Sequence, residues 1–192
     1  MQSEVQRRRF RQRLMLKSSL AKEILSEFLG TCIMIVLGCG SIAQSVLSRG
    51  TYGGTLAVNV GFSVAVGMAV YVAGGVSGGH INPAVSFAMC LFGRMKWFKF
   101  PFYVGAQLFG AFTGSAILFG VYYDSFMSFA DGELYIVGEN ATAQIFATYP
   151  APYLSLVNGF ADQVVWKLLL VDSYRGPYGW CCHGRPHLRS FH

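Results

Sequence analysis

Long apolar runs separated by short polar stretches are the main pattern of this 192-residue chain. A helix that crosses a hydrocarbon layer of about 30 Å needs roughly 20 apolar residues. Three runs have this length, and a fourth, weaker run begins near Leu154. Asp162 and Lys167 interrupt the fourth run, so it is a poor span unless these charges pair or snorkel. The pattern predicts an all-α integral membrane protein with three to four spans. The three runs of full length are about 21–46, 55–73 and 100–122.

Composition agrees with this prediction. Only 12% of the residues are charged and 53% are hydrophobic, whereas a soluble domain is about 25% charged. The net charge of +6 does not indicate a nucleic-acid partner, because seven of the fifteen Lys and Arg residues lie before residue 23, directly next to the first apolar run. Basic residues in that place are a signal of membrane topology.

The basic residues also predict how the chain is oriented. The leader, residues 1–19, and the linker with Arg94, Lys96 and Lys99 should both lie in the cytoplasm. The stretch 123–155 contains four acidic residues and no Lys or Arg, so it should face outward. The protein is therefore expected to be multi-pass, with a cytoplasmic N-terminus.

The outward stretch contains a candidate modification site. Asn140, Ala141 and Thr142 form an N-glycosylation sequon. Sequons also arise by chance, but this one lies on a loop that the charge pattern places outside. Asn140 is therefore the predicted glycosylation site.

A re-entrant segment follows from this topology. The second run ends near Gly74 on the cytoplasmic side, and the linker at Arg94 lies on the same side. The stretch between them, "GGVSGGHINPAVSFAMCLFG", must dip into the membrane and return. Asn82 is a good N-cap, and Pro83 suits the first helical position. About ten residues, 82–92, would give a half-helix of about 15 Å.

The N-terminal end of this half-helix and the loop before it carry polar groups that could line a path for solutes, called the polar lane below. Irregular backbone at membrane depth is tolerated only where it is buried in protein or lines a watery cavity. The carbonyl groups of the glycine-rich loop would accept hydrogen bonds, the Asn82 amide would donate, and the positive helix end would repel cations. Such a lane suits small neutral molecules with hydroxyl or amide groups. The candidate solute-binding residues are Gly78, Gly79, His80, Ile81, Asn82, Pro83 and Ala84.

Two acidic residues in the first run need separate interpretations. Glu27 lies among apolar residues, where a carboxylate is a functional or structural hypothesis. It is predicted to order the irregular loop by accepting its N–H groups. Interfacial snorkelling is the alternative, and it fits Glu23 better because Glu23 is nearer the surface. The small residues of Gly110–Gly114 are predicted to serve helix packing.

No cofactor, metal or enzyme activity is expected. Three cysteines lie in apolar runs, where a thiol packs as a small hydrophobe. The pair Cys181–Cys182 with His183 and His187 matches no usual zinc spacing. A membrane enzyme that uses Glu27 and His80 lacks a nucleophile–base arrangement.

Three segments together resemble the aquaporin, or major intrinsic protein, family: "LAKEILSEFLGT", "MAVYVAGGVSGGHINPAVSFAM" and "PFYVGAQLFGAF". The residues of these segments are similar to those of the aquaglyceroporin branch, and in particular to those of its broad-selectivity, liver-type neutral-solute channels. The resemblance implies a right-handed helical bundle, a passive channel for water, glycerol and urea, and a homotetramer in the plasma membrane.

The resemblance also implies roles for individual residues. Asn82–Ala84 matches the first signature triad of the family, and His80 matches its loop histidine. Phe62 matches the aromatic position of the narrow selectivity filter. Glu27 matches the first-span glutamate that braces the loop.

The chain departs from the family pattern after Val165. The resemblance covers residues 20–165, and residues 166–192 are interpreted as an unrelated tail. A second Asn-Pro pair, expected in an inverted second half together with a filter arginine, is not found in the sequence. The predicted fold is thus the first half of an aquaporin-like bundle. The predicted function is a channel impaired by the loss of its second half, or alternatively a non-conducting isoform that associates with full-length subunits.

Overall fold

The structure, a computed structural model, describes residues 18–136, 138, 140–147, 154, 155, 157–159 and 161. The predicted tail and nearly all of the leader lie outside the described residues. So does most of the fourth apolar run, including its charges Asp162 and Lys167.

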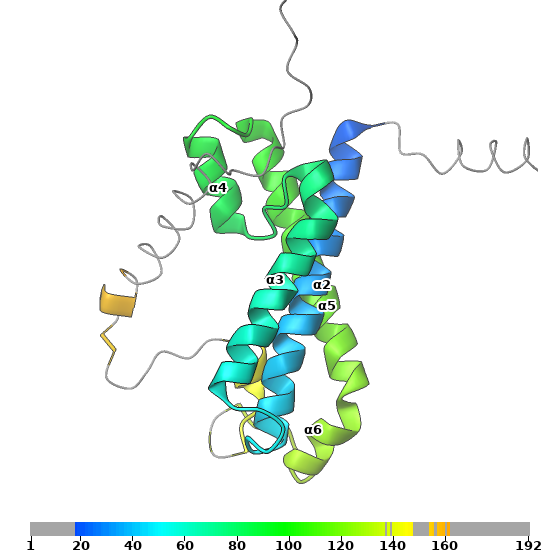
Figure 1. The fold of residues 1–192 in the computed structure, drawn as a ribbon, viewed down its shortest axis with the longest axis vertical. Helices are drawn as coiled ribbons and strands as arrows, with labels where there is room; N and C mark the ends of the chain where they lie inside the picture. Colours follow the sequence, from blue (N-terminus) through cyan, green and yellow to red (C-terminus); the bar gives the residue numbers. More distant parts are fainter. Residues whose placement is uncertain are drawn as a thin grey trace, which may run out of the picture.

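Three long helices form the bundle, and they lie side by side in Figure 1. Each is long and apolar enough to cross a membrane. The prediction of an all-α membrane protein with three full-length spans is therefore confirmed for the described part of the chain. The helices are α2 (Ser19–Leu47), α3 (Thr55–Ser77) and α5 (Phe100–Val121).

Helix α2 packs closely against α5 because two glycines of α5 lack side chains. A Cβ atom on Gly110 would lie 2.5 Å from the Phe28 carbonyl oxygen, and one on Gly114 would lie 2.8 Å from the Cys32 carbonyl oxygen. Small residues with this spacing let two membrane helices approach to backbone contact. The packing role predicted for Gly110–Gly114 is confirmed.

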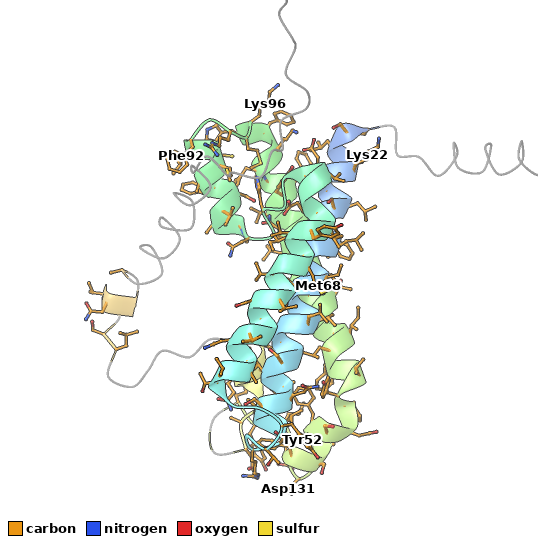
Figure 2. All side chains as sticks on the ribbon, in the orientation of Figure 1. Lys22, Tyr52, Met68, Phe92, Lys96 and Asp131 are labelled. Carbon is orange, nitrogen blue, oxygen red and sulfur yellow. The ribbon has the colours of Figure 1, made fainter. Side chains whose placement is uncertain are left out.

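The half-helix is α4 (Pro83–Leu91), with Asn82 as N-cap and Phe92 as C-cap. The nine residues of α4 would extend about 14 Å, close to half the hydrocarbon layer. In Figure 1 the chain leaves the top of α3, turns down, and returns upward through α4. Figure 2 shows Phe92 and Lys96 at the same end of the bundle as Lys22. Lys22 and the basic linker that contains Lys96 therefore share one end.

The opposite end holds a compact apolar cluster. Helix α6 (Tyr123–Phe129) and the 3₁₀ helix η2 (Ala143–Ile145) close this end. A second 3₁₀ helix, η1 (Trp97–Lys99), leads into α5 at the basic end. The buried members of the cluster are Cys39, Ala43, Leu118, Phe126 and Ile145.

Candidate functional site: the loop between α3 and α4

The loop between α3 and α4 has an unusual backbone. Helix α3 ends on Gly78, whose φ is +95°, and Gly79 follows with φ +64°. Glycine adopts such angles at little cost. Ile81 has φ +43°, which is a true outlier for a β-branched residue and persists only where the surroundings enforce it.

The carboxylate of Glu27 supplies that enforcement. Glu27 is fully buried in α2. Its Oε1 accepts from the backbone N–H of His80 at 2.9 Å and from Ser77 Oγ at 2.6 Å. Its Oε2 accepts from the backbone N–H of Ile81 at 2.7 Å and from Gln107 Nε2 at 2.8 Å. One side chain thus binds the end of α3, the loop and α5.

The half-helix begins with a cap at Asn82. Asn82 Oδ1 accepts from the N–H of Ala84 at 2.8 Å, and its carbonyl accepts from the N–H of Ser86 at 3.0 Å. Pro83, the first helical residue, has no N–H to satisfy. Because capping uses only Oδ1, the amide nitrogen of Asn82 keeps both hydrogens, and it has no partner among the described residues.

His80 links the loop to the half-helix. Its Nδ1 lies 3.1 Å from Ser86 Oγ, and its ring lies 5.2 Å from the ring of Tyr103, centroid to centroid. Ser86 is completely buried in α4 and also accepts from Gln107 Nε2 at 3.0 Å. The imidazole is therefore held between α4 and α5.

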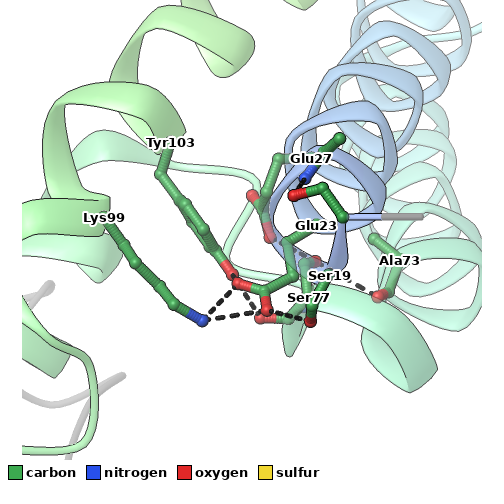
Figure 3. Close-up of polar contacts among 10 residues, drawn as sticks. Ser19, Glu23, Glu27, Ala73, Ser77, Lys99 and Tyr103 are labelled. Atoms are coloured by element: carbon green, nitrogen blue, oxygen red, sulfur yellow. Dashed lines mark hydrogen bonds and ion pairs between the residues drawn. The ribbon is translucent and has the colours of Figure 1, made fainter. Parts of the chain in front are cut away.

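The snorkelling interpretation of Glu23 is wrong. Figure 3 shows Glu23 facing Lys99 and Tyr103 of the neighbouring chain segments. Its carboxylate lies 2.6 Å from Lys99 Nζ and accepts from Tyr103 Oη at 2.9 Å and from Ser19 Oγ at 3.1 Å. Only 8% of Glu23 is exposed. Ser19 of the same helix and Lys99 and Tyr103 from across the bundle, rather than water, solvate the charge.

Sequence reasoning missed the contacts that η1 and α5 make with these acids. Lys99, Tyr103 and Gln107 are spaced four apart, which places them on one face of a helix. Glu23 and Glu27 have the same spacing on α2. Two matching polar stripes in otherwise apolar spans are the signal that could have found them.

Phe62 and Asn140 lie away from the loop. Phe62 is 16 residues before Gly78 on α3, about 24 Å along the helix. Its ring fills the space beside Gly38, where a Cβ would approach within 2.7 Å, and it packs on the cluster at the opposite end. Asn140 lies at that end too, where its Oδ1 accepts from Arg49 at 3.1 Å.

Known proteins resemble this chain over most of its described length. The family model described as "Major intrinsic protein" matches residues 15–176, which extends past Val165. Human Aquaporin-9 is 75% identical over 162 residues, which cover 84% of this chain and 55% of that protein. Human Aquaporin-10 is 46% identical over 158 residues, or 82% of this chain and 52% of the relative.

A solved structure shows the same fold. The X-ray structure of the aquaglyceroporin from Plasmodium falciparum superposes with a TM-score of 0.66 at 29% identity, and the match covers 76% of this chain and 56% of that one. The chain spans about half the length of the curated relatives it matches. With its three membrane-length helices and its family match over residues 15–176, the chain belongs to the major intrinsic protein, or aquaporin, family.

Proposed function

We propose that this chain forms part of a passive transmembrane channel for water, glycerol, urea and other small neutral solutes. The observation that carries the proposal is the half-helix α4, whose capped N-terminus opens at a loop braced by the buried Glu27. Membership of a channel family supports a transport function over an enzymatic one.

The chemistry of the loop supports neutral solutes. Gly78 and Gly79 have left-handed backbone angles that end the helical hydrogen-bond pattern of α3, so loop carbonyl groups are left to accept from a solute. Asn82 offers amide hydrogens at the positive end of α4. Hydrogen-bond donors beside carbonyl acceptors suit a hydroxyl group, which both donates and accepts. The carboxylate of Glu27 is fully buried and its two oxygens already accept four hydrogen bonds. A passing cation therefore finds no free carboxylate oxygen there to bind.

Low conduction by these 192 residues on their own is part of the proposal. Pro83, at the mouth of the half-helix, is exposed, and no second half-helix meets it among the described residues. A lane with one wall leaves solute in contact with lipid. We propose that flux is low unless another segment or chain supplies the opposing half-helix.

Association with full-length channel subunits is the second candidate function. Helix α3 presents an apolar face on which Tyr71 is 86% exposed and Leu56 is 77% exposed. Lipid can cover such a face, and so can the helices of a channel subunit. The proposed assembly is a homotetramer or a mixed oligomer in the plasma membrane, with a cytoplasmic N-terminus and with Asn140 glycosylated.

Stopped-flow measurements on proteoliposomes containing the purified chain test the channel proposal. The measured quantity is the glycerol and water flux in excess of that of empty vesicles. This excess is expected to rise, beyond the flux of the partner alone, when a full-length aquaglyceroporin partner is co-reconstituted. Gly79→Ala should remove the flux due to this chain, because Gly79 has φ +64° and a Cβ there would meet Gly74 Cα at 3.2 Å. Gly75→Ala is the matched control, since Gly75 has nothing within 4 Å. Absence of both flux and co-purification with the partner would overturn both candidate functions.

A further inference from the structure

In the described part of the chain, the side-chain amide of Gln107 forms hydrogen bonds through its nitrogen and not through its oxygen. Gln107 is 1% exposed, and its Nε2 donates to Glu27 Oε2 at 2.8 Å and to Ser86 Oγ at 3.0 Å. Its Oε1 is buried and has no hydrogen-bond partner within the described part of the chain. An unpaired buried acceptor is costly. The reversed amide would set two oxygens against each other at Glu27, so the two N–H bonds determine the orientation.

These two N–H groups bind one residue that holds the loop, Glu27, and one residue of the half-helix, Ser86. Glu27 holds the backbone of His80 and Ile81. Ser86 belongs to the half-helix, and its own N–H makes the first helical bond, to the carbonyl of Asn82. Gln107 therefore sets the position of the half-helix relative to the loop, one turn from the Asn82 cap.

The same bonds favour one position of the proton on the His80 ring. Ser86 Oγ receives a hydrogen from Gln107 and has one hydrogen of its own to give. The side-chain acceptor within reach, in the region that the structure describes, is His80 Nδ1 at 3.1 Å. A neutral imidazole that accepts at Nδ1 has its proton on Nε2. That nitrogen lies on the side of Gly78, where a Cβ would be 3.4 Å away.

We propose that Gln107 and Ser86 are positioning residues of the pore. Together they fix the half-helix and hold His80 in the Nε2–H tautomer, so that the ring presents a hydrogen-bond donor toward the loop. The lane then offers two side-chain donors, His80 Nε2 and Asn82 Nδ2, next to backbone acceptors. The significance for solute selection rests on the channel function proposed above, but the geometry itself can be tested without any flux.

Nitrogen-15 NMR of histidine-labelled chain in lipid nanodiscs tests the tautomer. The His80→Gln variant identifies the His80 signals among those of the four histidines. In the unmodified protein Nδ1 should resonate as an unprotonated nitrogen and Nε2 as a protonated one. Ser86→Ala should give a mixture of tautomers. Ser63→Ala, which removes an exposed hydroxyl bonded only within its own helix, should change nothing. A His80 signal that is unaffected by Ser86→Ala, or that shows Nδ1 protonated, overturns the proposal.

Hydrogen exchange tests the position of the half-helix. Gln107→Leu removes the bonds to Ser86 and to Glu27, and it should raise the exchange rates of the α4 amides at least about tenfold, the effect expected for the loss of a buried hydrogen bond. The control is Gln44→Leu, which changes an exposed glutamine of α2. If Gln107→Leu fails to fold, Ser86→Ala removes the Gln107–Ser86 bond by deleting a single oxygen and leaves the Gln107–Glu27 bond in place. Unchanged exchange of α4 in the Ser86→Ala variant contradicts the proposal. A chain that conducts no glycerol leaves both measurements interpretable.

Discussion

The Oε2 atom of Glu27 lies 2.7 Å from the backbone nitrogen of Ile81, 54 residues further along the chain. This bond joins a carboxylate in the middle of a membrane-length helix to a residue with positive φ. It relates two features that each need an explanation alone: a buried charge and a strained β-branched residue. The carboxylate gains a donor, and the strained N–H gains an acceptor.

Glu27→Gln is expected to destabilise the described bundle. Glutamine has one carbonyl oxygen, and its NH₂ group would face the N–H groups that the second carboxylate oxygen accepts. Loss of hydrogen bonds to a buried charged group costs about 3 kcal/mol. The unfolding free energy, measured by denaturant titration in mixed micelles, should fall by that amount. Glu133→Gln is the control, because Glu133 is exposed and, in the part of the chain that the structure describes, its side chain accepts from Tyr135. Equal losses in both variants would contradict the role of Glu27 as a brace of the loop.

Lys99→Met should leave Glu23 without its cation. The Lys99 side chain is 27% exposed and that of Glu23 is 11% exposed, so water can replace the lysine only in part. We expect a loss of about 2 kcal/mol, and a smaller loss when Glu23→Gln is added, because the unpaired charge is then gone. A thermodynamic double-mutant cycle measures this coupling.

Lys96→Met is the matched change for Lys99→Met. Lys96 is exposed and forms no ion pair among the described residues. Its replacement should alter the unfolding free energy by less than about 0.5 kcal/mol. A purely additive cycle at Glu23 and Lys99 would argue that their 2.6 Å contact contributes nothing.

Gly110→Ala should force α2 and α5 apart. The new Cβ would lie 2.5 Å from the Phe28 carbonyl oxygen, and a backbone atom cannot move aside as a side chain can. Overpacking of this kind costs about 1–3 kcal/mol. Gly105→Ala, in the same helix with nothing within 4 Å, should be neutral or slightly stabilising. Matching thermal stabilities of the two variants in detergent would rule out the close contact at Gly110.

Glycosylation of Asn140 should produce a mobility shift that a glycosidase reverses. The site is partly exposed, and within the described residues the Asn140 side chain bonds to the exposed Arg49, which can turn to water. Asn140→Gln should abolish the shift in a glycosylation-competent cell. Thr142→Ser keeps the sequon and should retain it. A chain that is never shifted would weaken the predicted outward position of this loop.

The sequence by itself determined the elements of this protein. Apolar runs of about 20 residues can only be helices in lipid, because the bilayer offers no other partner for backbone N–H and C=O groups. Asn82 and Pro83 marked the start of the half-helix to within one residue, since capping depends on local chemistry. Glu27 was singled out because an isolated carboxylate in an apolar run needs donors.

Only the tertiary structure decided which donors and acceptors meet. The position of Glu23 near the end of its run predicts contact with water, but its carboxylate binds Lys99 of η1 and Tyr103 of α5, which lie 76 and 80 residues further along the chain. Ser86 and Gln107 are isolated polar residues in apolar stretches, and only the packing of α4 against α5 brings them within 3.0 Å of each other. Local chemistry sets where each helix begins, whereas the partner of a buried polar group depends on how helices distant in the chain pack.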